Sequence, residues 1–137
     1  MRRVFADTGY WIALLNPRDE LHLKARQQSV VLAAAEIVTS EWVLTELLNS
    51  FAERGAQLRG VVSRTVELLQ TSPSVTVIPH SAPSFSAAFE LYRERSDKGW
   101  SLTDCSSFLI MHQLGIEAAL TYDKHFEQAH FQALLRT

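Results

Sequence analysis

The chain has 137 residues, a formal net charge of −2 at pH 7 and 20% charged residues. This length fits a single domain, residues 1–137, that buries about two-thirds of the surface of its unfolded chain. The small negative charge excludes a protein that coats DNA through a global basic field. It does not exclude a nuclease whose affinity for phosphate comes from bound cations.

The single cysteine, Cys105, excludes an internal disulfide framework and a cysteine-based zinc cluster. It favours a reducing cytoplasm as the location. Asp7 stands where a signal peptide needs a long apolar run, and the apolar segment 10–15 is too short to span a bilayer. We therefore expect a soluble, cytoplasmic chain without a membrane partner.

Short β-prone runs alternate with helical segments along the chain. Strands are expected at residues 3–6, 36–39, 75–78 and 118–122, with Asp7, Thr8 and Gly9 as a turn after the first. Helices are expected at residues 21–35, 41–51, 58–70, 84–95, 104–114 and 124–128, with Ser40 and Thr103 as N-caps and Gly115 as a stop. Alternation of this kind predicts an α/β sandwich with a parallel sheet covered on both faces.

Four carboxylates fall at places that this topology brings together. Asp7 follows the first expected strand and Asp123 follows the last, so both belong to the rim where ligands bind in such sheets. Asp104 lies in the first turn of a helix, where the helix dipole favours an anion. Glu46 lies on the border between the apolar and polar faces of its helix.

Each carboxylate also has an ordinary structural explanation. Asp7 and Asp123 are typical turn residues, Asp104 is a typical stabiliser of a first helical turn, and Glu46 alone is typical of a solvated helix face. Only their convergence at one rim points to a site.

Clustered carboxylates repel one another and raise their own pKa values unless a cation is bound. Oxygen ligands without cysteine favour Mg²⁺ or Mn²⁺. Such an ion supports hydrolysis of a phosphodiester, although phosphoryl transfer stays open.

Four stretches in this order resemble PIN-domain ribonucleases, and within them the VapC-like toxins of bacterial toxin–antitoxin pairs. They are VFADTGYWIALLNPRDELH from Val4, the helix that carries Glu46, WSLTDCSSFLIM from Trp100, and LTYDKHF from Leu120. The resemblance runs from residue 3 to about residue 131.

The resemblance implies a three-layer, Rossmann-like PIN-domain sandwich with a short, mainly parallel sheet and an Mg²⁺ or Mn²⁺ site. The matching positions are Asp7, Glu46, Asp104 and Asp123, implied as catalytic and metal-binding residues, with Asp7 and Asp104 as the firmest ligands. Thr8 is expected to orient Asp7 or a water molecule. The implied reaction is attack of a metal-activated water on RNA. The implied partners are an RNA substrate, an antitoxin protein and a second copy of the chain in a homodimer.

Several other residues could serve a site but have a structural explanation that we prefer. His22, in an Asp-x-x-His element with Asp19, is expected to make a structural hydrogen bond, and Cys105 to be a small buried residue. The remaining histidines, His125 among them, show no ligand or nucleophile spacing. Candidates for phosphate tracking are Arg54, Arg59 and Arg64, and candidates for base stacking are Tyr10, Trp42 and Trp100.

Three other enzyme or signalling classes do not fit the sequence. A haloacid-dehalogenase-like phosphatase needs an Asp where Gly9 stands, and a receiver-like phosphoacceptor needs an Asp where Pro79 and His80 follow the third strand. A dinucleotide-binding module needs a glycine-rich loop after the first strand. The remaining alternative is a catalytically inactive PIN-like module that binds RNA or protein without cutting.

Overall fold

The computed structural model describes residues 1–137, and its centre is a single sheet of five parallel strands. The strands are β1 (Arg3–Ala6), β2 (Glu36–Ser40), β3 (Val75–Ile78), β4 (Ala118–Leu120) and β5 (Gln132–Ala133). They are arranged in the order β3-β2-β1-β4-β5. Every neighbouring pair is parallel, so that Phe5 pairs with Val38 on one side and with Ala119 on the other. The predicted parallel α/β architecture is confirmed.

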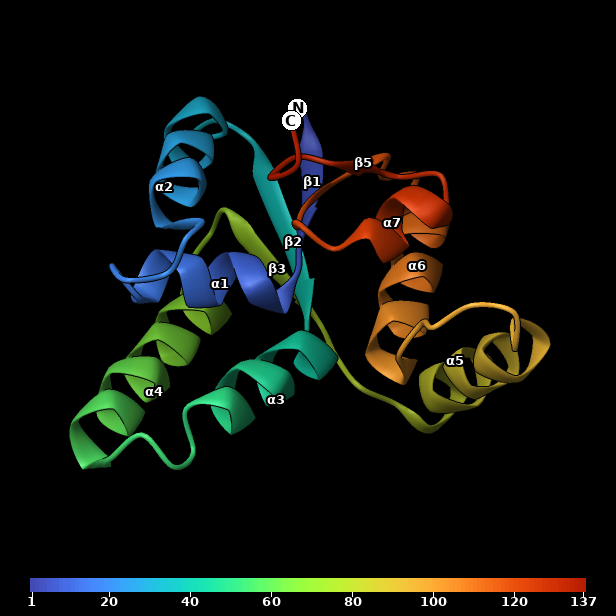
Figure 1. Cartoon of the computed structure of the whole chain (residues 1–137), viewed down its shortest axis with the longest axis horizontal. Helices are drawn as coiled ribbons and strands as arrows, with labels where there is room; N and C mark the ends of the chain where they lie inside the picture. Colours follow the sequence, from blue (N-terminus) through green and yellow to red (C-terminus); the bar gives the residue numbers. More distant parts are fainter.

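Helices cover both faces of this sheet. They are α1 (Thr8–Leu15), α2 (His22–Val31), α3 (Glu41–Ser50), α4 (Ala56–Thr71), α5 (Ala82–Glu94), α6 (Leu102–Leu114) and α7 (Lys124–Gln128). Figure 1 shows α1, α2 and α4 on one side of the strands and α5, α6 and α7 on the other, with α3 beyond the end of β2. The chain is therefore a three-layer sandwich. None of its helices combines the length and the apolar character needed to cross a membrane.

The central strand β1 is buried, and its carboxyl end is tied to β2. Its residues Val4, Phe5 and Ala6 are completely buried in the hydrophobic core. Thr39 of β2 donates a hydrogen bond to the Ala6 carbonyl at 2.9 Å, and the Trp11 indole of α1 reaches the Thr39 hydroxyl at 3.4 Å. These contacts hold the end of β1, where Asp7 follows.

The order of the strands places a topological switch point beside β1. The chain proceeds outward from β1 through β2 to β3, and then returns to the opposite side of β1 to form β4 and β5. In open parallel sheets, the crevice at the carboxyl ends of the two strands flanking such a reversal is the usual binding site. Here those strands are β1 and β4, which lead directly into Asp7 and Thr121.

The structure corrects some of the expected boundaries. Thr8 and Gly9 were expected to form a turn but make the first turn of α1, which has Asp7 as its N-cap. The cap of α6 is Ser101, whereas Thr103, the expected cap, lies inside the helix. The expected helix at 21–35 ends as α2 at Val31. The two-residue strand β5 has no counterpart among the expected elements. Ser40 and Gly115 have the predicted roles.

Candidate functional site

Asp7 forms the floor of the site at the carboxyl end of β1. Its backbone N–H donates to the Leu120 carbonyl at 3.2 Å, which ties the residue to the end of β4. Its side chain makes no capping bond to α1. Instead, Oδ2 of Asp7 accepts a hydrogen bond of 3.0 Å from the Thr121 hydroxyl, so the carboxylate is directed toward the crevice between β1 and β4.

The raised pKa of Asp7 shows that Asp104 and Glu46 lie near it. The pKa of the Asp7 carboxyl is raised from 3.8 to about 7, mainly by burial and to a smaller extent by the negative charges of Asp104 and Glu46. Hydrogen bonds from the Thr8 backbone and the Thr121 side chain act in the opposite direction. Three of the predicted carboxylates therefore converge on one region, and without a cation they oppose ionisation of Asp7.

Glu46 reaches the site from α3. This helix starts at the end of β2, where the Ser40 hydroxyl accepts a hydrogen bond from the Val43 N–H, as expected for an N-cap. The Thr8 hydroxyl donates a 2.6 Å hydrogen bond to Oε1 of Glu46. We expected Thr8 to orient Asp7 or a water through its side chain. Its hydroxyl instead orients Glu46, and its backbone N–H acts on Asp7 by lowering the pKa of that carboxyl.

Asp104 combines a structural role with its place in the site. It is the third residue of α6 and forms a capping box with Ser101. The Ser101 hydroxyl accepts from the Asp104 N–H, and Oδ2 of Asp104 accepts from the Ser101 N–H, both at 3.0 Å. Burial raises the pKa of the Asp104 carboxyl, and the charge of Asp123 raises it as well. The box fixes one oxygen of Asp104 and thereby the direction of the other.

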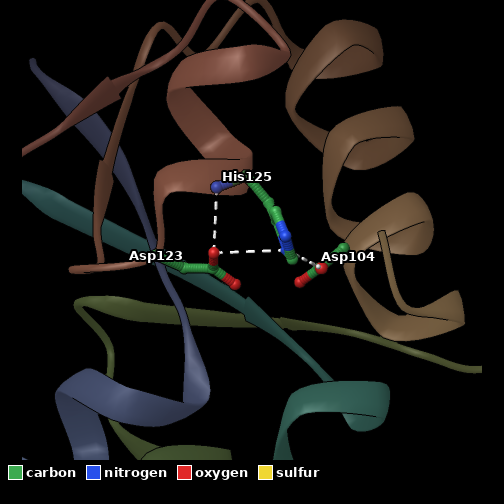
Figure 2. A group of neighbouring side chains, drawn as sticks. All are labelled: Asp104, Asp123 and His125. Carbon is green, nitrogen blue, oxygen red and sulfur yellow. Dashed lines mark hydrogen bonds and ion pairs between the residues drawn. The ribbon is translucent and has the colours of Figure 1, made fainter. Parts of the chain in front are cut away.

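Asp123 and His125 complete the group, as Figure 2 shows. Asp123 is the N-cap of α7, and its Oδ1 accepts a 2.9 Å hydrogen bond from the His125 N–H. The His125 ring turns back so that Nδ1 lies 3.0 Å from Oδ2 of Asp104 and 3.3 Å from Oδ1 of Asp123. The dismissal of His125 on the basis of its spacing was wrong, because the short helix α7 places its ring between two site carboxylates.

Thr121 is a second residue that the sequence did not single out. It is buried, its hydroxyl donates to Asp7, and the same hydroxyl accepts from the Asp123 N–H at 3.0 Å. One side chain thus connects the acids that follow β1 and β4. The sequence places Thr121 at the end of an expected strand, two residues before Asp123. This position alone does not distinguish it from an ordinary strand residue.

The structure places most of the remaining candidates outside the site. His22 bonds the Ala13 carbonyl through Nδ1 at 2.7 Å, as expected of a structural residue. Cys105 is buried, and burial raises the pKa of its thiol to about 11, so it is unreactive. Trp100 and Tyr10 belong to the core. Trp42 is the stacking candidate that lines the same cavity as Glu46.

Two of the three basic candidates, Arg54 and Arg59, have local partners. Arg59 donates to the Ala52 carbonyl at 2.8 Å, and the Arg54 guanidinium lies 5.5 Å from the centre of the Phe51 ring. These contacts tie both side chains to the connection between α3 and α4. Their role in phosphate tracking stays a prediction.

The donor set of the site fits a hard divalent cation. Oxygen atoms of Asp104 and Asp123 and a ring nitrogen of His125 lie within 4.8 Å of one another, and Asp7 and Glu46 are coupled to the same region by charge. The raised pKa values of Asp7 and Asp104 mean that these acids resist ionisation until a positive charge arrives. Carboxylate-rich sets of this kind suit Mg²⁺ or Mn²⁺. The assignment of each residue as a ligand stays a prediction.

Comparison with known families agrees with this geometry. The family described as PIN domain matches residues 4–132, nearly the whole chain. The chain therefore belongs to the PIN-domain family, as its sequence predicted.

Similarity to one relative indicates the subgroup of the PIN-domain family that the chain resembles. The chain is 29% identical over 131 residues to VapC20 of Mycobacterium tuberculosis, named a 23S rRNA-specific endonuclease, with 93% of this chain and 95% of that protein covered. The crystal structure of VapC20, described as a sarcin–ricin loop cleaving toxin, matches with a TM-score of 0.79 at 27% identity over the same shares of the two chains. The predicted likeness to VapC-like members is confirmed.

More distant structures share the fold. FitAcB from Neisseria gonorrhoeae matches with a TM-score of 0.63, covering 95% of this chain and 94% of that one. FitAB bound to a DNA fragment matches with a TM-score of 0.66, covering 95% and 92%. Both are 18% identical to this chain, so they bear on its architecture alone.

Proposed function

We propose that this chain is a divalent-metal-dependent endoribonuclease and the toxin of a VapBC-type toxin–antitoxin pair. The observation that carries the proposal is the convergence of Asp7, Glu46 and Asp104 at the switch point, expressed in the pKa of about 7 for Asp7. Such a cluster is unfavourable for the fold by itself. It would become favourable when a divalent cation occupies the crevice, and that cation could in turn bind a phosphate group.

The residues have distinct roles in this proposal. Asp7 and Asp104 would hold the cation, while Glu46 and Asp123 would act on it directly or through water. Thr8, Thr121 and Ser101 fix the directions of Glu46, Asp7 and Asp104 by the hydrogen bonds described above. A bound divalent cation would supply an acidified water and neutralise charge on the phosphate. No side chain is required as a covalent nucleophile, which agrees with the buried, unreactive Cys105.

The substrate class follows from the relatives. VapC20, which aligns with almost the whole chain, is named an endonuclease for 23S rRNA and a sarcin–ricin loop cleaving toxin. We therefore propose structured ribosomal RNA as the substrate and the sarcin–ricin loop as the first RNA to test. An antitoxin protein that blocks the crevice and a homodimer of this chain belong to the same proposal.

The alternative function is a PIN-like module that binds RNA or a protein without cutting. All four carboxylates are present and oriented by hydrogen bonds to oxygen and nitrogen donors. A module that only binds would not need this arrangement, since its acidic groups oppose an RNA backbone. Cleavage activity decides between the two functions.

The test compares RNA cleavage by the wild type and by Asp104→Asn, each with Mn²⁺, Mg²⁺ or EDTA. The RNA is a hairpin that carries the 23S sarcin–ricin loop, with total ribosomal RNA beside it. We expect metal-dependent cutting that falls at least about 100-fold in Asp104→Asn, because a metal ligand and its charge are lost. Asp97→Asn is the matched control, since Asp97 is exposed and paired with Arg95. Absence of cutting, or cutting that survives both EDTA and the Asp104→Asn substitution, would refute the proposed metal-dependent endoribonuclease activity.

A further inference from the structure

A cavity of about 610 Å³ opens beside the acidic site. Its wall comes from three parts of the chain: α3, the residues after β3, and the start of α6. The lining residues are Glu41, Trp42, Thr45, Glu46, Asn49, His80, Leu102 and Thr103. Glu46 belongs to both the cavity and the acidic site, and Thr103 immediately precedes Asp104. A ligand in the cavity is therefore next to any group bound at the carboxylates.

An aromatic cluster forms one wall of this cavity. The Trp42 ring lies edge-on to His80 with 4.5 Å between ring centres, and almost parallel to Phe85, at 6.1 Å and 8°. The Glu41 side chain accepts a hydrogen bond from the His80 N–H, which fixes the segment that carries His80. The rings are thus held in place before any ligand arrives. Rigid aromatic faces beside a nuclease site are suitable surfaces for stacking of bases.

The charges of the cavity select a base over a phosphate. Glu41 and Glu46 are the ionisable acids in its lining, and no arginine or lysine stands among the lining residues. A phosphate would be repelled there, whereas the N–H and amino groups of a base would find acceptors. Thr45 and Asn49 follow Glu41 at successive turns of α3 and offer further polar groups along the same face.

The composition of the lining disfavours a protein side chain as the occupant. Of the eight lining residues only Trp42 and Leu102 are hydrophobic, and the volume is within the range of about 300–1,000 Å³ typical of small-molecule sites. Along α3, Trp42 lies one turn from Glu46, about 6 Å along the helix axis. A nucleotide neighbouring the one whose phosphate is cut can span this distance.

We propose that this cavity is a subsite for an unpaired nucleobase next to the scissile phosphate, stacked against Trp42, in edge-on contact with His80 and recognised at its amino edge by Glu41. The subsite rests on the proposed ribonuclease function, whose site it extends. It favours adenine, cytosine or guanine, which carry an amino group, over uracil. It therefore contributes sequence preference within an unpaired RNA segment.

The first experiment measures cleavage kinetics on a single-stranded RNA, with Trp42→Ala, Trp42→Phe and His80→Ala variants. We expect KM to rise about 5- to 100-fold in Trp42→Ala with kcat changed less than about threefold, because stacking is lost while the carboxylates are intact. Trp42→Phe should recover most of the loss and show that the fold is intact. Phe89→Ala is the matched control, since Phe89 is a 44% exposed aromatic residue of α5 outside the cavity lining.

A second experiment measures binding directly by tryptophan fluorescence. Trp11 and Trp100 are buried at 7% and 6% exposure, so Trp42 is the tryptophan that a bound base can quench. Oligonucleotides rich in adenosine or cytidine, added to the non-cleaving Asp104→Asn variant, should quench more strongly than oligouridine. Glu41→Gln should reduce this preference, because it removes the charge but keeps an oxygen acceptor for His80.

The outcomes separate the subsite from the enzyme. An active wild type with an unchanged KM in Trp42→Ala overturns the subsite and leaves the nuclease standing. A wild type that cuts no RNA refutes the nuclease, and with it the substrate that the subsite is meant to hold. If Phe89→Ala raises KM as much as Trp42→Ala, and light scattering shows that both convert a dimer into monomers, the aromatic face is a contact between copies and the subsite is refuted.

Discussion

His125 holds two acidic residues through one ring nitrogen. Its Nδ1 lies within 3.3 Å of both Asp104 and Asp123, while its Nε2 faces Gly99, where an added Cβ would lie 3.7 Å away. The hydrogen bond from His125 lowers the pKa of Asp104 and so opposes the effect of burial. The ring therefore keeps Asp104 nearer to the ionised form that a cation requires.

The position of the donor nitrogen gives a prediction for His125. An Asn at this position places its amide N–H near Nδ1, whereas a Gln reaches toward Nε2. We expect His125→Asn to retain most of the RNA cleavage activity and His125→Gln to lose about tenfold or more, with a higher Mn²⁺ concentration for half-maximal rate. Circular dichroism controls for folding. Equal activity of the two variants would contradict a positioning role and would mean that His125 contributes through packing alone.

The sequence allowed the carboxylates to be predicted but not their supports. Asp7 and Asp123 follow strands, and this position alone identifies the rim of a parallel sheet. Thr121 and His125 gain their roles from side-chain directions that depend on the exact end of β4 and on the single turn of α7. Spacing along the chain does not encode these directions. Thr8 shows the same limit, because its partner Glu46 is 38 residues away.

At the scale of elements, two helices of this chain begin with the same motif in different surroundings. Ser81 caps α5 and Ser101 caps α6, each by a capping box with the residue three positions later. In α5 the partner is Ser84, on the surface. In α6 the partner is Asp104, so the box that stabilises the helix also orients a site carboxylate. This explains why an acidic residue stands at the third position of a largely buried helix.

These two caps allow a matched pair of variants. Ser101→Ala and Ser81→Ala should each lower the free energy of unfolding by about 1 kcal/mol, since each removes one N-cap. Only Ser101→Ala should also reduce metal-dependent cleavage, by about three- to tenfold, because Asp104 loses its anchor. Thermal unfolding and cleavage rates with Mn²⁺ test this. Equal loss of activity in both variants would mean that the effect is one of stability alone.

The boundaries that the sequence missed have a common cause. Asp7, Thr8 and Gly9 are turn formers by local preference, yet α1 begins directly after β1 because Tyr10, Trp11 and Ala13 are buried in the core. Tertiary burial thus overrides the local signal. Likewise β5 has two residues, fewer than any periodic pattern can reveal, and forms because Ala133 pairs with Ala119.

At the scale of the whole molecule, the alternation of strands and helices predicts a parallel sheet but not its strand order. The reversal at β1 determines which strand ends flank the crevice. Once the order is β3-β2-β1-β4-β5, Asp7 and Asp123 are on neighbouring connections. The fold therefore gathers carboxylates at one edge, which makes stability depend on their protonation.

This charge gives a prediction for the stability of the metal-free protein. The pKa of Asp7 is 3.8 in the unfolded reference and about 7 in the folded chain, so the folded state binds more protons between these values. The stabilising effect of protonation is complete below about pH 4 and disappears as pH rises through about 7. In EDTA, wild type should lose up to about 4 kcal/mol of this contribution between pH 4 and pH 8, since one pKa unit corresponds to about 1.4 kcal/mol.

Divalent cations should reverse this loss. Mn²⁺ competes with protons for the same carboxylates, so it should raise Tm more at pH 8 than at pH 5, by on the order of 5 °C or more. Asp7→Asn should be more stable than the wild type at pH 8 in EDTA, depend less on pH, and gain little from Mn²⁺. Scanning calorimetry at both pH values, with and without the metal, tests all three statements. Two results would contradict this prediction: equal stabilisation of the wild type by Mn²⁺ at pH 5 and pH 8, or an Asp7→Asn variant that keeps the full pH dependence. Either result would show that Asp7 is not the group that couples folding to the cation.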